Sequence, residues 1–256
     1  MQDWVVANII VFFASLLQAT TGFGFAIMAT PFLLLVYNSR DCIQLSILLS
    51  FFIAIILTPN IWRAIHYGLL RRLIVGSIVG TPIGLLLFVY MSLDVVKVFI
   101  GIITLIVACF SLMKCWNNRL SRVLVKTEEL ASTIGESPLG RGQWLAGVCS
   151  GILTTSIGMP GVPLALYFSV NHINKEIIRS TTLAFFIAVY TFSIVVQVFT
   201  VRIGEDVLWS SVELVPAVVA GVICGHFLFP KISQTLFQLI VNVILLSTAI
   251  YLLAKT

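Results

Sequence analysis

The stretch TSIGMPGVP, residues 155–163, puts two glycines and two prolines into nine positions between long apolar runs. Both residue types interrupt helices, glycine through its conformational freedom and proline through its missing N–H. The flanking runs, rich in Leu, Val, Ile and Phe, are otherwise typical of continuous helix. The stretch therefore predicts a break in the backbone deep inside an apolar region, and the sequence around it indicates what the break is for.

The composition of the 256-residue chain is that of a membrane protein. Hydrophobic residues make up 59% of the sequence and charged residues 10%, whereas a water-soluble domain carries about 25% charged residues. Several apolar runs reach the roughly 18–20 residues that span a bilayer core. The sequence therefore predicts an all-α polytopic membrane protein, whose net charge of +5 indicates cationic cytoplasmic loops rather than nucleic-acid binding. The first run, residues 4–21, is expected to remain in the mature protein because no cationic region precedes it.

The apolar segments form two series of five, with a polar stretch between them. They lie near residues 4–21, 24–37, 43–59, 68–90 and 95–113, and then near 143–153, 163–171, 180–200, 207–229 and 233–254. Setting Pro31 against Pro163 aligns GFGFAIMATPFLLL (22–35) with TTSIGMPGVPLALY (154–167). The matched order predicts a duplication, with a first transmembrane repeat over 1–114, a polar linker over 115–142 and a second transmembrane repeat over 143–256.

The positive charges favour halves of opposite orientation. If the first two segments of each half form a hairpin that enters and leaves on one side, each half makes an odd number of crossings. Eleven cations then share a side, namely Arg63, Arg71, Arg72, Lys114, Arg119, Arg122, Lys126, Arg141, Lys175, Arg179 and Lys231. The opposite side holds Arg40, Lys97, Arg202 and Lys255, and an even count separates the charges less well. The positive-inside rule then predicts inverted-topology repeats in the inner membrane, with both termini outside and the linker 115–142 in the cytoplasm.

The hairpin of the second half looks too short for two full crossings. Its first leg, 143–153, is about 16 Å long at 1.5 Å per residue, and the return leg from Pro163 is shorter. The hydrocarbon core is about 30 Å thick, so a re-entrant hairpin fits better, with about three transmembrane helices following in each half. Non-helical backbone at that depth must be buried in protein or line a cavity. The tips 22–30 and 154–162 are therefore expected to face each other, although full crossings are left open.

The two tips have the chemistry of an anion site. A helix N-terminus offers free N–H groups and a partial positive charge, and Thr30 is placed to cap a helix that begins at Pro31. Further hydroxyl groups belong to Thr20, Thr21, Thr154, Thr155 and Ser156. The alternative is that small residues only allow close helix packing, which is the preferred interpretation for the GxxxG stretches 80–84 and 221–225.

The acidic residues indicate the sign of the ligand. All ten Asp and Glu fall in loops or at segment ends, so no carboxylate is expected inside a helix to coordinate a cation or relay protons. The candidate charge partners of an anion are Arg63, Arg179 and His226. The five cysteines form no CxxC pair, so neither a metal nor another cofactor is expected. The sequence contains no HExxH motif, no GxSxG motif and no intrahelical Asp pair, so it gives no indication of an enzyme.

With both tips in view, the sequence resembles the TauE/SafE family of sulfite exporters. The matching stretches are TGFGFAIMATPFLLL (21–35), SGILTTSIGMPGVPLALYF (150–168) and NKEIIRSTTLAFFI (174–187). The resemblance implies a transporter of small sulfur-containing anions such as sulfite, sulfonates or sulfoacetate. Carried over residue by residue, it implies that the substrate-binding residues are Gly22, Gly24, Thr30, Pro31, Thr154, Thr155, Ser156, Gly158, Gly161 and Pro163.

Together, these expectations predict an exporter that binds its anion at the two tips and works by alternating access. Phe25, Ala26 and Met28 depart from the glycine-dense pattern of the family, and their bulk would narrow or dry the tip. The expected partners are a small anionic substrate and the lipid bilayer, with no nucleic acid, and a homo-oligomer is left open. The alternatives are an anion channel for similar ions and a non-transporting structural membrane subunit. The sequence leaves the particular anion, the direction and the coupling ion undetermined.

Overall fold

The computed structural model describes residues 2–121, 140–170, 175–228 and 234–254, which form ten α-helices and no strand. The first half contains α1 (Gln2–Thr21), α2 (Phe25–Tyr37), α3 (Asp41–Leu57), α4 (Tyr67–Tyr90) and α5 (Leu93–Ser121). The second half contains α6 (Gly140–Ile157), α7 (Gly161–Val170), α8 (Lys175–Thr200), α9 (Glu205–Leu228) and α10 (Gln234–Ala254). Two 3₁₀ turns, η1 (Thr58–Asn60) and η2 (Trp62–Ala64), lie between α3 and α4. The predicted all-α architecture is confirmed.

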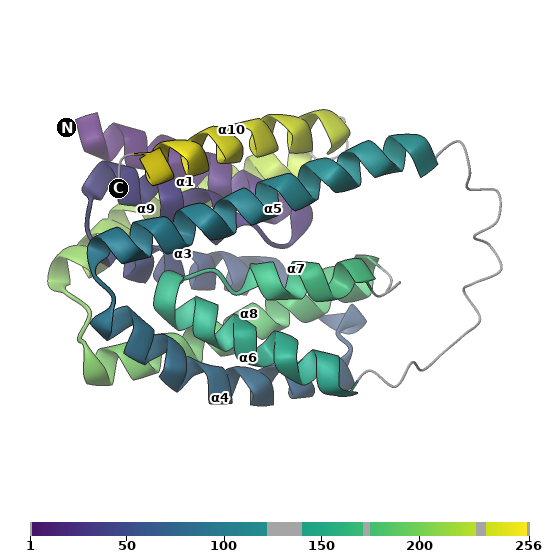
Figure 1. The fold of residues 1–256 in the computed structure, drawn as a ribbon, viewed down its shortest axis with the longest axis horizontal. Coiled ribbons are helices and arrows are strands. Elements are labelled where there is room, and N and C mark those ends of the chain that lie inside the picture. The colour runs from purple at the N-terminus through teal and green to yellow at the C-terminus, as the bar shows by residue number, and fades with distance from the viewer. Residues whose placement is uncertain (1, 122–139, 171–174, 229–233, 255–256) are drawn as a thin grey trace.

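The helices lie side by side and alternate in direction along the long axis of the molecule (Figure 1). The hairpin of α1 and α2 returns to the end that holds the N-terminus, whereas the hairpin of α6 and α7 returns to the opposite end. The C-terminus lies at the same end as the N-terminus, and α5 ends at the other. This arrangement fits an odd number of crossings in each half, while the inverted repeat stays a prediction.

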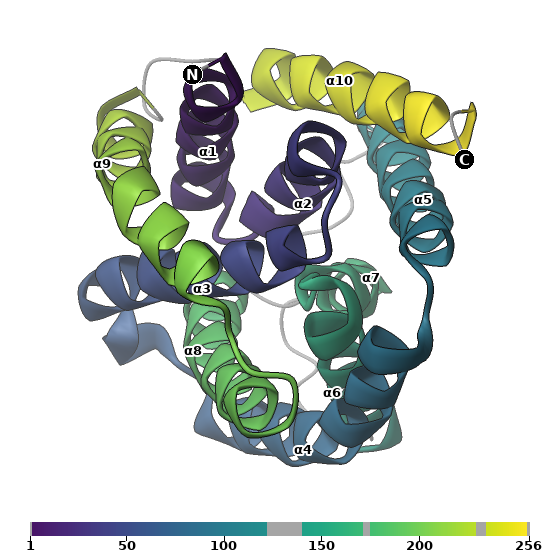
Figure 2. The ribbon, with the colours of Figure 1, turned by 90° about the vertical axis from the view of Figure 1, so that its left-hand side faces the viewer.

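The two short helices α2 and α7 lie inside a ring of longer helices (Figure 2). With 13 and 10 residues, they are about 20 Å and 15 Å long at 1.5 Å per residue. Neither could cover a hydrocarbon core of about 30 Å alone. Because neighbouring helices surround them, their N-terminal ends and the breaks before them lie within protein, where irregular backbone is tolerated.

Glycine-lined contacts join the two halves. A Cβ atom built on Gly80 of α4 would lie 2.1 Å from the carbonyl oxygen of Val148 in α6, and one built on Gly221 of α9 would lie 2.4 Å from that of Phe12 in α1. No side chain fits at either position, so the helix backbones approach this closely only because glycine stands there. The interpretation of the GxxxG stretches 80–84 and 221–225 as packing surfaces is confirmed. In both contacts the first helix of one half packs on the fourth helix of the other.

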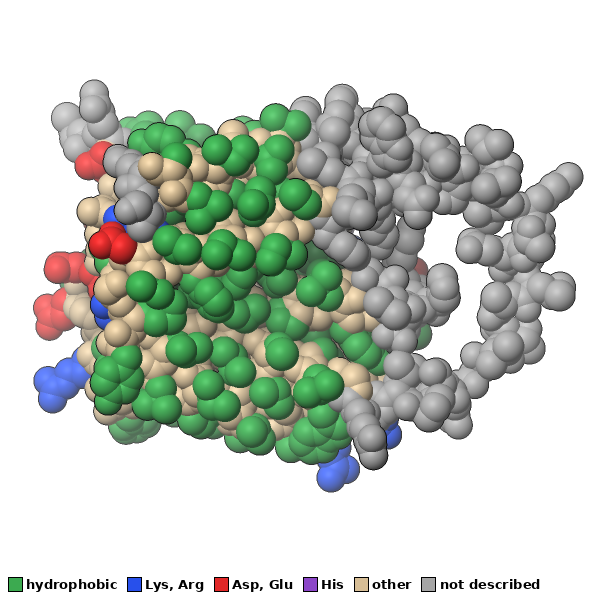
Figure 3. Space-filling view, viewed as in Figure 1, with side chains coloured by type: hydrophobic (Ala, Val, Ile, Leu, Met, Phe, Trp, Pro, Cys, Tyr) green, Lys and Arg blue, Asp and Glu red, His purple; other side chains and the backbone are tan. Residues whose placement is uncertain are grey.

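The outer surface carries an apolar band, with charged side chains gathered at the end that holds both termini and a few Lys or Arg side chains visible at the other end (Figure 3). Exposed aromatic side chains lie towards both ends, with Trp4, Tyr90 and Trp209 at one end and Trp62, Tyr67 and Trp144 at the other. Aromatic belts of this kind mark the two membrane–water interfaces. Among the described residues, four stretches are long and apolar enough to cross a membrane, namely Asp3–Thr21, Tyr67–Tyr90, Glu176–Thr200 and Glu205–Phe227.

Helices α5 and α6 extend furthest beyond the predicted segments. Helix α6 runs to Ile157 rather than to residue 153, so its 18 residues extend about 27 Å and the predicted short first leg is wrong. The polar residues at its end are accommodated within the helix because their hydroxyl groups donate to carbonyl oxygens four positions earlier. Helix α5 continues past residue 113 to Ser121. Residues 122–139 of the predicted linker lie outside the described residues.

Candidate functional site

Each half contains one break between its first and second helices. Helix α1 ends at Thr21, and Gly22 and Gly24 take positive φ angles of 83° and 122° before α2 begins at Phe25. Helix α6 ends at Ile157, and Gly158 takes a φ of 78° before α7 begins at Gly161. Only glycine adopts such angles without steric cost, so these glycines determine where the chain turns. We call residues 22–24 tip 1 and residues 158–160 tip 2.

Tip 1 ends earlier in the chain than the sequence predicted. Gly24 is the N-cap of α2 and Pro31 lies inside the helix, so the prediction that Thr30 caps a helix starting at Pro31 is wrong. A proline within a helix leaves one carbonyl group without its donor, which membrane helices tolerate when neighbouring helices surround them. The register that sets Pro31 against Pro163 is also wrong, because the positive-φ residues Gly22 and Gly158 occupy the equivalent places.

The N-termini of α2 and α7 are buried and open towards the tips. Gly24 provides no side-chain cap, and the first N–H groups of a helix have no partner within it. Phe25, Ala26 and Ile27 are at most 6% exposed, as is Val162 in α7. No hydrogen bond of the described residues satisfies the N–H groups of these four residues. Pro163 falls in the first turn of α7, where its missing N–H costs nothing. The two helix starts therefore present unpaired donors and a partial positive charge inside the protein.

The two breaks meet in the middle of the molecule. A Cβ atom built on Gly161, the first residue of α7, would lie 3.7 Å from the Cβ atom of Phe23 in tip 1 and 3.4 Å from Cζ of Phe186 in α8. One built on Gly158 would lie 3.5 Å from the carbonyl oxygen of Ile43 in α3. The predicted meeting of the two tips is present in these contacts.

Hydrogen bonds close each tip on itself. In tip 2, the Ser150 hydroxyl donates to the carbonyl oxygen of Pro160 at 2.9 Å, and the N–H groups of Gly158 and Met159 donate to carbonyl oxygens of α6. In tip 1, the Gly22 N–H donates to the Gln18 carbonyl oxygen at 2.8 Å and the Thr21 hydroxyl bonds to the backbone of Phe23. These bonds fix the turns without using the first N–H groups of α2 and α7.

The predicted hydroxyl donors are engaged within α6. The side chains of Thr154, Thr155 and Ser156 are at most 1% exposed. They donate to the carbonyl oxygens of Ser150, Gly151 and Ile152, respectively. Their protons are therefore not directed at a ligand in this conformation, and the free donors at the start of α7 are backbone N–H groups. Thr30 differs, because its buried Oγ1 has no hydrogen-bond partner.

Of the three candidate charge partners, only Arg179 reaches a tip. Its Nη2 donates to the carbonyl oxygen of Ala19 near the end of α1 at 2.8 Å, and its Cγ lies 2.6 Å from where a Cβ atom of Gly22 would stand. Arg63 is exposed in η2 at one end of the molecule. His226 is exposed in the last turn of α9 and packs edge-on against Phe227. The structure thus does not bring Arg63 or His226 to the site.

The interior around the tips holds no buried carboxylate among the described residues. Glu213 lies in the third turn of α9, so the prediction that every acidic residue falls at a segment end is wrong, but its side chain is exposed. The described residues also contain no group of three or more His, Cys, Asp or Glu placed to bind a metal ion. The buried polar side chains are amides and hydroxyls, which favour an anion over a cation because no negative charge opposes it.

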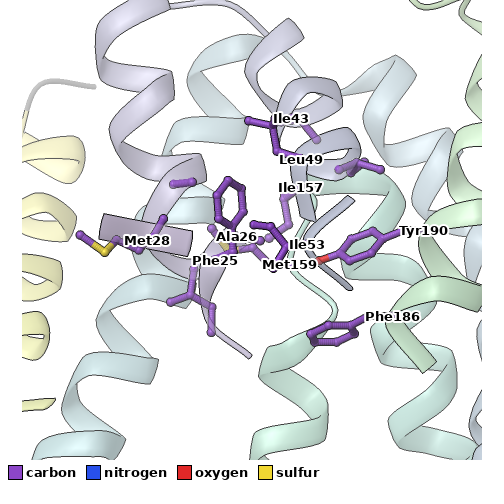
Figure 4. Close-up of a cluster of buried hydrophobic side chains, with 14 of the residues drawn as sticks. Phe25, Ala26, Met28, Ile43, Leu49, Ile53, Ile157, Met159, Phe186 and Tyr190 are labelled. Atoms are coloured by element: carbon purple, nitrogen blue, oxygen red, sulfur yellow. The ribbon is translucent and has the colours of Figure 1, made fainter. Parts of the chain in front are cut away.

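Sequence reasoning noted the bulk of Phe25 but missed the other large side chains that surround the tips. Phe25, Met159, Phe186 and Tyr190 belong to one buried cluster, with the Tyr190 ring directed towards Met159 (Figure 4). Because they belong to strongly apolar segments, no sequence signal separates them from ordinary core residues. The buried amides Gln18 and Gln197 were also missed, although a glutamine inside an apolar segment is a visible signal, since polar groups are costly there.

Comparison with known proteins gives one match. The model of a family described as "Sulfite exporter TauE/SafE" matches residues 7–252, which is nearly the whole chain and includes both tips. No curated protein and no solved structure matches the chain.

Proposed function

We propose, because the chain belongs to the sulfite exporter TauE/SafE family, that it exports small sulfur-containing anions such as sulfite or a sulfonate. The family and the apolar helices identify the protein as a membrane transporter. Since members of the family are transporters, the proposal includes no enzymatic step.

The observation that carries the proposal is the pair of buried helix N-termini at the tips. The first N–H groups of α2 and α7 have no partners among the described residues, and unpaired donors at the positive ends of two helices favour an anion. We place the anion against Gly24 and Gly161, with Thr154, Thr155 and Ser156 behind tip 2. The absence of a buried carboxylate among the described residues removes the group that would repel it.

Transport is proposed to occur by alternating access between the two halves. Tip 1 belongs to the first half and tip 2 to the second, so a movement of one half against the other would change the side from which the anion is reached. The opposite directions of the two hairpins (Figure 1) support this proposal. The membrane is proposed to be the inner membrane, with both termini outside and the linker 115–142 in the cytoplasm, because cationic loops favour the cytoplasmic side.

Binding by the purified full-length protein in detergent tests the substrate class. Calorimetry or thermal shift is measured with sulfite, thiosulfate, sulfoacetate, taurine and sulfate. We expect at least one sulfur oxyanion to bind and to raise the unfolding temperature, because a ligand that binds the folded state stabilises it. Binding of a cation or an amine instead, with no response to any of these anions, would contradict the proposal.

A pair of substitutions at Gly161 tests the role of the backbone donors. Gly161→Pro removes the first N–H group of α7 at a position where proline is well tolerated, whereas Gly161→Ala keeps that group and adds only a Cβ atom. The nearest heavy atoms to this Cβ lie at ordinary contact distances of 3.4 and 3.7 Å. We expect Gly161→Pro to bind the anion about 10-fold more weakly, as for the loss of a hydrogen bond to a charged group, and Gly161→Ala to bind it as the wild type does. Equal affinities in the two variants would show that the first N–H group of α7 does not bind the anion.

Counterflow in reconstituted liposomes separates a transporter from a channel. Labelled sulfite should accumulate against unlabelled sulfite loaded inside, because a carrier exchanges its ligand across the membrane. An anion channel would show no counterflow. A structural subunit would show neither counterflow nor anion binding, and replacing Thr155 or Ser156 with Ala would change nothing measured here.

A further inference from the structure

Arg179 connects α8 to the end of α1 at tip 1. Its guanidinium Nη2 donates to the carbonyl oxygen of Ala19 at 2.8 Å, and a Cβ atom on Gly22 would lie only 2.6 Å from its Cγ. The residue at position 22 must therefore be glycine for two reasons, the positive φ of 83° and the space that Arg179 occupies. The side chain lies against the break itself.

The equivalent contact at tip 2 is made by a neutral side chain of the same helix. Gln197 Nε2 donates to the carbonyl oxygen of Thr155 at 3.3 Å. Thr155 stands three positions before Gly158, as Ala19 stands three positions before Gly22. Helix α8 thus binds the same carbonyl group of each hairpin, with arginine at one tip and glutamine at the other. A neutral amide is enough for this capping role, so capping alone does not explain a positive charge at tip 1.

Two residues that contact or hydrogen-bond Gly22 carry buried donors without partners. Nε of Arg179 and Nε2 of Gln18 have no hydrogen bond, and Gln18 is 1% exposed. Gln18 stands one helical turn before Gly22, whose N–H donates to its carbonyl oxygen. Buried unpaired donors are costly and rare. Two of them beside one glycine therefore indicate a ligand that this conformation does not show.

We infer that Arg179 is the charged substrate-binding residue of this transporter, with Gln18 as a second donor at tip 1. The inference rests on the proposed function. Nη2 uses one N–H group to hold the end of α1, which leaves Nε and the remaining N–H groups of the planar guanidinium to donate to the oxygens of one oxyanion. The ligand class is an oxyanion such as sulfite or a sulfonate, rather than a halide or hydrosulfide, neither of which has oxygen atoms to accept the paired N–H groups. Tip 2 supplies backbone donors and no charge.

Substitution of Arg179 by the residue that serves tip 2 tests this inference. Arg179→Gln can keep a donor for the Ala19 carbonyl while removing the charge, and Arg179→Lys keeps the charge while removing the paired N–H groups. Gln197→Met is the matched control, because it removes the cap at tip 2 without changing any charge. Calorimetry on the full chain in detergent compares sulfite, methanesulfonate and chloride.

We expect Arg179→Gln to raise the Kd for sulfite and methanesulfonate by about 10-fold to 100-fold, the range for a lost hydrogen bond to a charged group. Arg179→Lys should bind both oxyanions more weakly than the wild type and lose their preference over chloride. Gln197→Met should lower the unfolding temperature and leave the Kd within about 2-fold, since its contact lies away from the charge. If Arg179→Gln does not fold, Arg179→Lys and Gln18→Met carry the same test, with a weaker loss expected for Gln18→Met.

Three results would overturn the inference. These are wild-type affinity in Arg179→Gln, unchanged oxyanion preference in Arg179→Lys, or an equal loss of affinity in Gln197→Met. Each of them leaves the proposed function standing as long as the wild type binds sulfur oxyanions. Failure of the wild type to bind any of them would overturn both.

Discussion

The two tips have similar backbone conformations but are contacted by different side chains. Each ends a long helix at a glycine of positive φ and starts a short interior helix within three residues. Tip 1 lies against Arg179, whereas Gly158 of tip 2 lies against Ile43 and Ile47 of α3. Tip 2 is also closed by Ser150, which donates to Pro160. The comparison teaches that the shape of the site is shared between the halves while its positive charge belongs to one of them.

The helices that carry the tips are also held differently. The contact of α6 with α4 is lined by glycines on both sides, namely Gly76, Gly80, Gly84, Gly147 and Gly151, whose added Cβ atoms would all meet backbone of the other helix at 2.1–2.6 Å. The contact of α1 with α9 has Gly221 and Gly225, both on α9. Close backbone packing on both sides makes α6 the more rigidly held of the two helices. We therefore expect tip 1 to have more freedom to move than tip 2.

The largest expected effect comes from breaking the α4–α6 contact. Gly80→Ala places a Cβ atom 2.1 Å from the Val148 carbonyl oxygen, which only a shift of the backbone can relieve, and we expect a loss of about 3 kcal/mol or more in the free energy of unfolding. In the α1–α9 contact, Gly225→Ala meets the Cβ atom of Ala19 at 2.8 Å and should cost less. Gly204→Ala, which meets nothing within 4 Å, is the control. Thermal unfolding in detergent ranks the three variants, and equal stability of the first two would refute the difference in packing.

Alanine at the two turning glycines compares the tips directly. Gly158→Ala should cost about 1–2 kcal/mol from its left-handed backbone alone, because its Cβ atom finds ordinary contacts at 3.5 Å. Gly22→Ala should cost more and also weaken anion binding, because its Cβ atom displaces Arg179. Unfolding temperature and calorimetric Kd are measured for both. Loss of anion affinity in Gly158→Ala alone would reverse the assignment of charge to tip 1.

Removal of the bond that closes tip 2 should have a moderate effect. Ser150→Ala leaves the Pro160 carbonyl oxygen without its 2.9 Å donor, and we expect a loss of about 1 kcal/mol. Ser211→Ala, whose exposed hydroxyl donates within α9, should change stability by less than about 0.5 kcal/mol. Chemical or thermal unfolding of the two variants checks the difference, and it would be refuted if Ser211→Ala proved the less stable.

The smallest expected effect is at Thr30. Its buried Oγ1 has no hydrogen-bond partner, so Thr30→Val replaces an unpaired polar atom with a methyl group of similar size. Such an exchange is neutral or slightly stabilising. We expect the unfolding temperature to stay the same or rise slightly. A clear fall would mean that this hydroxyl has a partner in the folded protein.

The sequence predicted the location of both breaks but not their extent. Glycine fixed the turns at Gly22 and Gly158, as its conformational freedom requires. The prediction that a helix begins at Pro31 was wrong, because Pro31 lies within α2. The prediction that residues 154–156 lie in a loop at tip 2 was wrong. A polar run is typical of a loop, but the hydroxyl groups of these residues bond to carbonyl oxygens of their own helix. Both errors come from local rules that burial among other helices overrides.

The sequence by itself determined the class of the protein and the sign of its ligand. Its apolar content requires a membrane, and the unpaired backbone of a membrane segment requires helices. The positions of the acidic residues pointed to an anion, and although Glu213 lies within α9, the described residues contain no buried carboxylate. Only the tertiary structure decided which cation reaches the site. Arg63, Arg179 and His226 were equivalent candidates in the sequence, and Arg179 alone meets a tip, across 160 positions of the chain. A contact of that range depends on how α8 packs against α1, and no local pattern of residues encodes it.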